Sequence, residues 1–206
     1  MSRFVLVHGA WQGGWCWQRL AAELEGRGHA VETPDLPSED VILGPRDYAR
    51  GLGDCADAVV VGHSLGGLTI GLVDARVHVY LSAILPIEGG YARSLRPDFG
   101  GSLRDELGRS YWPDLETAAA RLYPDCDRAT VEWAFGLLRR QAPLTPEPVE
   151  FGAGDVWVGC LRDIAIDPGA GRALLARSLE LDAGHFPMLT RPRETADLLE
   201  SIASSV

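Results

Sequence analysis

The sequence lacks the features that mark disulfide-rich, metal-binding or membrane-spanning proteins. Its 206 residues include only four cysteines, Cys16, Cys55, Cys126 and Cys160, at irregular spacings and without a CxxC pair. This spacing predicts neither a zinc site nor a disulfide framework, and it favours free, buried thiols. No apolar run approaches membrane-spanning length, and a strand-like run begins at residue 3, so we expect neither a transmembrane helix nor a signal peptide.

Positive charge is also scarce. The chain carries 19 Lys and Arg against 29 Asp and Glu, a formal net charge of -10. With no basic run, it is not expected to bind nucleic acid or an anionic membrane surface. We therefore expect a cytoplasmic protein whose partner is a small-molecule substrate, and a homodimer is compatible with the sequence. A chain of this length can bury a sufficient core as one domain, residues 1–206.

The most informative segment is residues 62–67, Gly-His-Ser-Leu-Gly-Gly, which directly follows the apolar run 58–61. A strand that stops at a serine, with glycines two residues before and after it, can turn sharply into a helix without side-chain clashes. The turn leaves the hydroxyl of Ser64 exposed at the carboxyl end of the strand, beside the positive end of the helix dipole. We predict a nucleophile elbow at Ser64, followed by a helix in the run 68–75.

Short apolar runs alternate along the chain with longer segments of helical spacing, the pattern of a parallel sheet covered by helices on both faces. This predicts an α/β fold with a mostly parallel central sheet of about six strands. The predicted strands are residues 3–8, 30–34, 58–63, 77–82, 155–160 and 177–182. Helices are predicted around residues 17–24 and 198–202, where apolar residues recur at i, i+3 and i+4.

One stretch breaks this alternation. Residues 87–150 show no strand signal, many prolines and at least two helical patterns. We interpret the stretch as a short helical cap inserted over the sheet. Asp127 is the predicted N-cap of one cap helix, because an apolar face begins four residues after it.

His185 is the candidate general base. A serine hydroxyl needs a base within hydrogen-bond reach, usually a histidine that a carboxylate holds in one tautomer. Among five histidines, His185 lies in a loop just past the last predicted strand, where the carboxyl edge of the sheet would place it over Ser64. Strand alternation should point His63 away from Ser64, and His8 is expected to brace a loop.

The acid that orients this histidine should come from the loop after the fifth predicted strand, because that loop lies beside the histidine loop in such a sheet. Asp163 and Asp167 both qualify. We favour Asp163, since Asp167 precedes a proline and is typical of a helix start. Asp182 is a weaker candidate, because it lies on a strand and close to His185 in the sequence.

Backbone donors for a developing oxyanion are predicted at Ala10, in the loop after the first strand, and at Leu65, directly after the serine. Gly9 would permit the tight turn that aims both N–H groups at one point. Nucleophile, base and donors would all be supplied by the protein, so neither a metal nor an organic cofactor is expected.

The chain resembles the α/β-hydrolases, and more narrowly the plant methylesterase and hydroxynitrile lyase branch with its bacterial relatives. The resemblance covers nearly the whole chain and rests on residues 4–17, 62–67, 79–86, 160–163 with Ile166 and Pro168, and 184–192. It implies the α/β-hydrolase fold, with Ser64 as nucleophile, His185 as base and Asp163 as the orienting acid, in the chain order expected of this fold.

Two departures favour hydrolysis over lyase chemistry. The lyases of this branch carry a threonine after the first-strand histidine and a lysine after the catalytic histidine, whereas this chain has Gly9 and Phe186. Without that hydroxyl and that cation, release of cyanide loses its stabilising partners.

We therefore expect a serine hydrolase that cleaves small hydrophobic or aromatic carboxylic esters through an acyl-enzyme. The residues predicted to wall the substrate pocket are apolar or aromatic: Trp11, Leu85, Trp112, Trp133 and Phe186. Two alternatives remain open on sequence alone. The same site could perform carbon–carbon cleavage or a cyclisation, or the chain could be a ligand-binding protein on a hydrolase fold.

Overall fold

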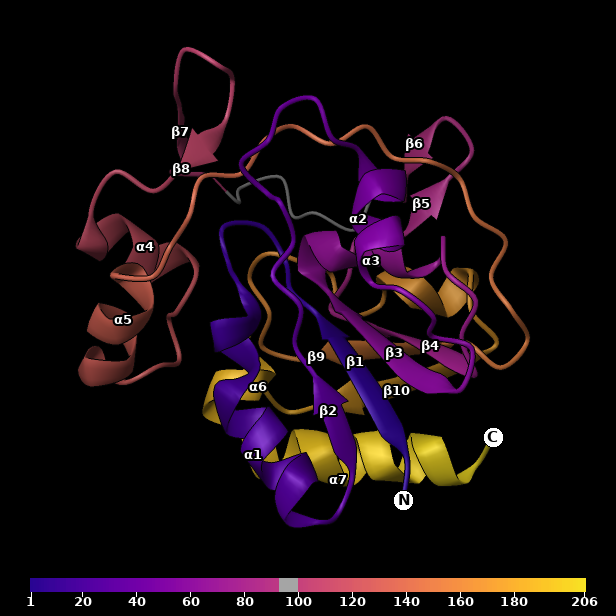
Figure 1. Cartoon of the computed structure of the whole chain (residues 1–206). Helices are drawn as coiled ribbons and strands as arrows, with labels where there is room; N and C mark the ends of the chain where they lie inside the picture. The colour runs from indigo at the N-terminus through magenta and orange to yellow at the C-terminus, as the bar shows by residue number, and fades with distance from the viewer. Residues whose placement is uncertain (93–99) are drawn as a thin grey trace.

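A central parallel sheet organises the computed structural model, which describes residues 1–92 and 100–206 (Figure 1). Its six strands are β1 (Arg3–Val7), β2 (Ala30–Glu32), β3 (Ala58–His63), β4 (Val77–Leu81), β9 (Val156–Cys160) and β10 (Arg177–Leu181). They lie in the order β10-β9-β4-β3-β1-β2, and every neighbouring pair is parallel. All six predicted strands are confirmed to within one or two residues at each end.

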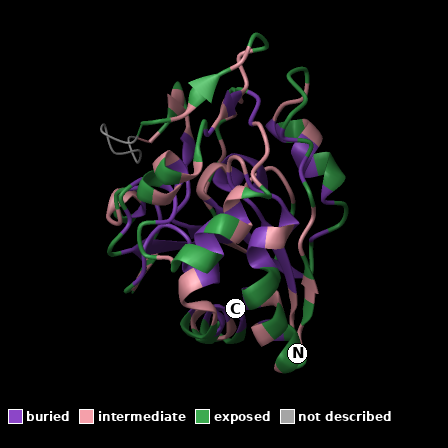
Figure 2. Cartoon of the chain, turned by 90° about the vertical axis from the view of Figure 1, so that its left-hand side faces the viewer, coloured by how far each residue is buried: buried purple, intermediate pink, exposed green. Residues whose placement is uncertain are grey.

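Helices cover both faces of the sheet. The helices α1 (Gln18–Gly26) and α7 (Pro192–Ser204) pack on one face, and α2 (Pro45–Gly51) and α3 (Gly67–Ile70) on the other (Figure 1). A hydrophobic core lies on each face of the sheet, and alternate residues of β1 belong to different cores: Phe4 packs into the core beside α1 and α7, and Val5 into the core beside α2 and α3. Figure 2 shows the buried sheet enclosed by helices whose outer turns are exposed. Across residues 1–92 and 100–206, no helix has the length and apolarity needed to cross a bilayer.

The helix after the elbow is shorter than predicted. Instead of continuing through residue 75, it ends at Ile70, and Gly71 is its C-cap. A Cβ atom at Gly71 would lie 2.8 Å from the hydroxyl of Tyr80 and 2.9 Å from Val149, so this position requires a glycine. The apolar pattern of the sequence does not reveal this close contact.

The segment 87–150 contains the helices α4 (Leu115–Arg121) and α5 (Arg128–Phe135), which lie side by side outside the sheet (Figure 1). Asp127 accepts a hydrogen bond from the backbone N–H of Thr130 at 2.7 Å, which confirms the predicted N-cap. Residues 93–99 of the expected cap lie outside the described residues.

The expectation that this segment forms no strands is wrong. Two antiparallel pairs occur, each built from strands of two residues. They are β5 (Pro86–Ile87) with β6 (Gly90–Tyr91), and β7 (Leu103–Arg104) with β8 (Ser110–Tyr111). Two residues cannot display an alternating pattern, so a periodicity argument misses such strands.

A histidine–aspartate pair joins β4 to the start of β9. The imidazole of His78 donates from Nδ1 to Asp155 at 3.0 Å and from Nε2 to the carbonyl of Val73 at 3.1 Å. Burial alone would lower the pKa of His78, but the hydrogen bond and the charge of Asp155 raise it above its usual value. The histidine is thus favoured in its charged form.

Stability should therefore depend on pH at this pair. A raised pKa in the folded state stabilises the fold fully below the ordinary histidine pKa, and this contribution is lost as the pH rises through the folded value. We expect Asp155→Asn to lower the free energy of unfolding by about 2 kcal/mol near pH 6, and by less near pH 8.5. Urea unfolding at both pH values measures this.

The matched control is Asp57→Asn, which removes an exposed carboxylate that pairs with Arg3. It should change the free energy of unfolding by less than about 1 kcal/mol at both pH values. A loss at Asp155 that is the same near pH 6 and pH 8.5 would contradict a charged His78.

Candidate active site

The turn after β3 places Ser64 at the carboxyl edge of the sheet. Ser64 has a φ of 51°, in the left-handed region that few residues other than glycine adopt, and begins the short 3-10 helix η2 (Ser64–Gly66). A Cβ atom at Gly66 would lie 2.7 Å from the carbonyl oxygen of Val7. The glycine therefore lets the elbow approach β1, and the strained turn presents the serine side chain.

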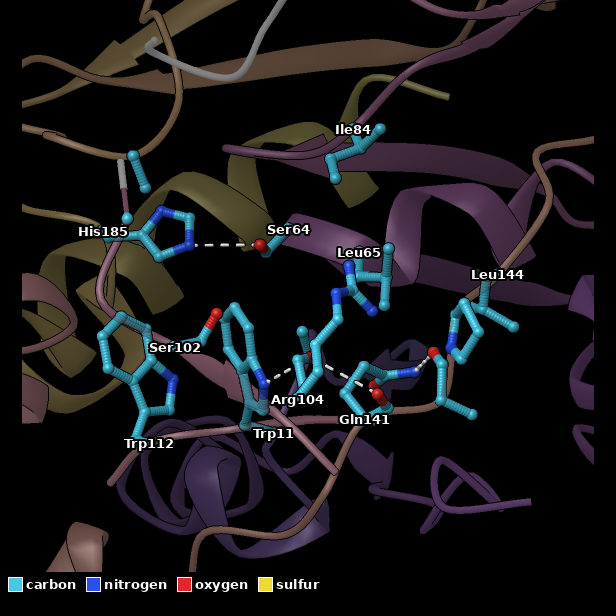
Figure 3. A pocket seen from close by; sticks show the side chains of 16 residues that line it. Trp11, Ser64, Leu65, Ile84, Ser102, Arg104, Trp112, Gln141, Leu144 and His185 are labelled. Carbon is cyan, nitrogen blue, oxygen red and sulfur yellow. Dashed lines mark hydrogen bonds between the residues drawn. The ribbon is translucent and has the colours of Figure 1, made fainter. Parts of the chain in front are cut away.

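His185 lies over this serine, as the strand order predicts. Its Nε2 atom is 3.1 Å from the Oγ of Ser64, and the hydrogen bond between them is drawn in Figure 3. His185 follows β10 in a loop, yet it is only 3% exposed. The hydroxyl and the imidazole are thus within proton-transfer distance in a largely desolvated position.

Asp163 completes the hydrogen-bonded chain. Its Oδ2 atom lies 2.7 Å from Nδ1 of His185, and Oδ1 accepts from the backbone N–H groups of Ala165 and Ile166 at 2.7 and 3.0 Å. Burial alone would raise the pKa of Asp163, but the charge and hydrogen bond of His185, with the two N–H donors, hold it below its usual value. The carboxylate therefore stays ionised and fixes the proton of His185 on Nδ1.

The structure does not bring the other two candidate acids to His185. Asp167 is exposed and accepts a hydrogen bond from the backbone N–H of Gly169 at 2.8 Å. Asp182 is exposed and pairs with Arg162 at 3.0 Å. Both carboxylates have local structural partners.

His63 forms no hydrogen bond with Ser64 among the described residues, and it has a contact that the sequence did not reveal. Its Nε2 atom donates to the backbone carbonyl of His185 at 2.7 Å. Burial, with the nearby charge of His185, lowers the pKa of His63 well below its usual value, so its ring is neutral. His8 braces a loop, since its Nε2 atom accepts from the backbone N–H of Leu36 at 3.0 Å.

A cavity of about 330 Å³ opens beside Ser64 (Figure 3). Its described lining comes from the elbow, the loop after β1, the β7–β8 pair and the segment 141–144. The lining residues are Ala10, Trp11, Ser64, Leu65, Ile84, Gly100, Ser102, Arg104, Ser110, Trp112, Gln141, Ala142, Pro143, Leu144, Ala165 and His185. Most of these side chains are apolar. No group of three or more His, Cys, Asp or Glu side chains suited to a metal ion occurs among the described residues.

Ala10 and Leu65 both line this cavity next to Ser64. Leu65 is the second residue of η2, and the first N–H groups of a helix have no acceptor within it. Within residues 1–92 and 100–206, the N–H of Ala10 donates to no acceptor. A Cβ atom at Gly9 would lie 2.8 Å from the Cβ of Ser64, so the loop after β1 lies directly against the elbow.

Three of the five predicted pocket residues do not line the cavity. Trp11 and Trp112 line it, but Leu85 is fully buried in the core between the sheet and α2 and α3. Trp133 on α5 packs edge-on against Trp15, with ring centroids 5.2 Å apart. Phe186 is 2% exposed and packs on Tyr123, with centroids 4.8 Å apart. Leu85 and Phe186 thus belong to the cores on either side of the sheet, and the half-buried Trp133 packs against one of them.

Trp11 links the loop after β1 to the segment 110–139 by two hydrogen bonds. Its φ of 64° is left-handed, its indole Nε1 donates to the Oγ of Ser110 at 3.0 Å, and its carbonyl accepts from the backbone N–H of Arg139 at 2.8 Å. Trp11 directly follows Ala10. Its hydrogen bonds with Ser110 and Arg139 therefore hold in place the loop after β1 that contains Ala10.

Removing the hydrogen bond between Trp11 and Ser110 should slow catalysis without unfolding the chain. We expect Trp11→Phe, which keeps an aromatic ring but loses the indole N–H, to lower kcat for an ester about 5-fold, the equivalent of one hydrogen bond. Ser110→Ala should have the same effect, and the double variant should lose no more than either single one, as steady-state kinetics can measure. Additive losses would show that the two residues act independently.

Comparisons with known proteins place the chain among esterases. The model of the Alpha/beta hydrolase family matches residues 4–198. The rice protein "Probable esterase PIR7A" (Oryza sativa subsp. indica) is 33% identical over 255 aligned positions, which cover 98% of this chain and 97% of that protein. These positions outnumber the 206 residues of the chain, so the rice protein has residues without a counterpart here.

Two further relatives are bacterial. The carbendazim hydrolyzing esterase of Nocardioides sp. (strain SG-4G) is 39% identical over 118 aligned positions, which cover 47% of this chain and 48% of that protein. The crystal structure of a pyrethroid hydrolase from Sphingobium faniae JZ-2 has a TM-score of 0.81 at 21% identity and covers 99% of this chain and 98% of that chain. The latter similarity is one of fold.

Proposed function

The chain belongs to the alpha/beta hydrolase family and is a carboxylic ester hydrolase, and we propose that it cleaves small hydrophobic or aromatic esters through an acyl-enzyme on Ser64. The observation that carries this proposal is the hydrogen-bonded chain Ser64–His185–Asp163 beside a cavity. Its geometry suits nucleophilic catalysis with a general base.

Acylation begins at the Ser64–His185 hydrogen bond. Nε2 of His185 accepts the hydroxyl proton as the Oγ atom attacks the ester carbonyl, and the charge that develops on the carbonyl oxygen faces the N–H groups of Ala10 and Leu65. The tetrahedral intermediate then collapses, the bond to the alcohol oxygen breaks, and His185 returns its proton to the leaving alcohol.

Deacylation repeats these steps with water. His185 removes a proton from a water molecule that attacks the acyl-enzyme, and the acid leaves as Ser64 regains its proton. Asp163 stabilises the imidazolium that forms in both half-reactions, because it is ionised and hydrogen-bonded to Nδ1. His63 helps to position the base through its hydrogen bond to the carbonyl of His185.

The cavity supports a small substrate. Its volume of about 330 Å³ is at the lower end for ligand pockets, and Trp11, Trp112, Ile84 and Leu144 supply apolar walls. Most of the wall opposite the elbow comes from residues 100–144. We propose that the segment 87–150 is a helical cap of a single hydrolase domain.

The proposal is tested with p-nitrophenyl acetate, butyrate and phenylacetate. We expect turnover of these esters, a burst of p-nitrophenol equal to the enzyme concentration if deacylation is the slower step, and an acyl group on the Ser64 peptide after acid quench. Acylation at another residue, or a burst of p-nitrophenol without an acyl adduct on Ser64, would overturn the mechanism. Modification of Ser64 without turnover of any ester would instead favour carbon–carbon cleavage or cyclisation, and inertness toward every probe would favour a binding protein.

A further inference from the structure

Arg104 is a charged cavity residue that the proposed mechanism does not use. It is exposed on β7 and lines the cavity beside Ser64 with Ser102, Trp112 and Leu144. Figure 3 shows its side chain extending toward Leu65. A guanidinium is permanently charged and presents five N–H donors.

The guanidinium is held in place by its own hairpin. Its Nη1 atom donates to the backbone carbonyl of Gly108 at 2.7 Å, in the turn between β7 and β8. Arg104 is also the register partner of Ser110, whose hydroxyl accepts from Trp11. This hydrogen bond orients the guanidinium within the hairpin, and in the described part of the chain its other N–H groups have no hydrogen-bond acceptor.

No described carboxylate neutralises this charge. Asp105, the next residue, pairs instead with Arg109 at 2.9 Å and with Arg140 at 2.7 Å. Across residues 1–92 and 100–206, Arg104 takes part in no ion pair, and the described cavity lining contains neither Asp nor Glu. Among the described residues this charge has no anionic partner, and because the arginine lines a cavity beside the reactive serine, its position suits an anionic group on the ligand.

We propose that Arg104 selects esters that carry a free carboxylate, namely the half-esters of dicarboxylic acids. In this arrangement the ester carbonyl lies at Ser64, the carbon chain of the acyl group contacts the apolar walls, and the distal carboxylate accepts hydrogen bonds from the guanidinium. Charge-assisted pairing between a guanidinium and a carboxylate is strong and geometrically specific. This inference rests on the proposed esterase function and names its substrate class.

The test compares monomethyl esters of succinate, glutarate, adipate and pimelate with methyl esters of monocarboxylic acids of the same chain length. We expect at least one half-ester to have a kcat/KM about 10-fold or more above that of its neutral counterpart, and Arg104→Gln to lower this ratio about 10-fold, to near one. Arg104→Lys should retain part of the ratio, because it keeps the charge but loses the planar fork. The preference should also weaken as salt concentration rises.

The control variant is Arg193→Gln, which removes an exposed arginine on α7, outside the cavity lining, and should leave the ratio as in the wild type. Equal kcat/KM values for half-esters and neutral esters in the wild type, or a ratio unaffected by Arg104→Gln, would overturn the role of Arg104 while the neutral esters still report the esterase. Failure to hydrolyse either series would overturn the proposed function as well.

Discussion

Replacing His185 with alanine is expected to lower kcat for ester hydrolysis by about 10⁵-fold or more, because serine and base act as one unit and loss of either removes nearly all of their contribution. Without the imidazole, nothing within hydrogen-bond distance of the Ser64 hydroxyl among the described side chains can accept its proton. The residual rate should come from the oxyanion donors and from binding alone. Steady-state kinetics with a p-nitrophenyl ester gives the measurement.

A control is needed because His185 is only 3% exposed, so that alanine leaves a cavity in a packed region. His185→Gln fills most of this volume and offers no group that can take up the proton at neutral pH. Both variants should show the circular dichroism spectrum of the wild type and similar losses of activity. Substantial turnover by either folded variant would rule out His185 as the base.

Asp163→Asn should lower kcat by about 10⁴-fold, the effect of losing tautomer control in a comparable arrangement. The amide cannot hold the His185 proton on Nδ1 through an ionised oxygen, and it cannot stabilise the imidazolium. The effect on stability should be smaller, because one side-chain oxygen can still accept from Ala165 and Ile166.

The matched control is Asp167→Asn, four residues further along the same loop. This carboxylate is exposed and, within the part of the chain that the structure describes, accepts a hydrogen bond only from the N–H of Gly169, so the variant should keep kcat within about 2-fold of the wild type, as for most surface substitutions. If Asp167→Asn is the damaging change and Asp163→Asn is not, the orienting acid has been misassigned.

The sheet could be predicted from the sequence because its inner strands, such as β1, β3 and β9, are almost entirely apolar runs with a clear end. In β3, the residues Val59 and Val60 belong to opposite cores, so both must be apolar and the run stands out. The end of α3 at Ile70 could not be predicted, because the apolar run continues past it and the space beside Gly71 is limited by residues distant in the sequence. Tertiary packing of this kind leaves no periodic signal.

The catalytic residues could be predicted from the sequence, whereas the residues that line the pocket could not. Ser64, Asp163 and His185 follow strands of one parallel sheet, so topology alone predicts that they meet at its carboxyl edge. The pocket walls follow no such rule. An apolar residue such as Phe186 serves the core as well as a pocket, and Arg104 lies in a hairpin too short to be recognised.

The most direct test of the account is fluorophosphonate labelling followed by peptide mass spectrometry. The central claim is that Ser64 is a nucleophile activated by His185. It predicts a single adduct on the peptide that contains Ser64, formed at a rate that collapses in His185→Ala and absent in Ser64→Ala. An adduct on a different residue, or equal labelling of the wild type and His185→Ala, would contradict it.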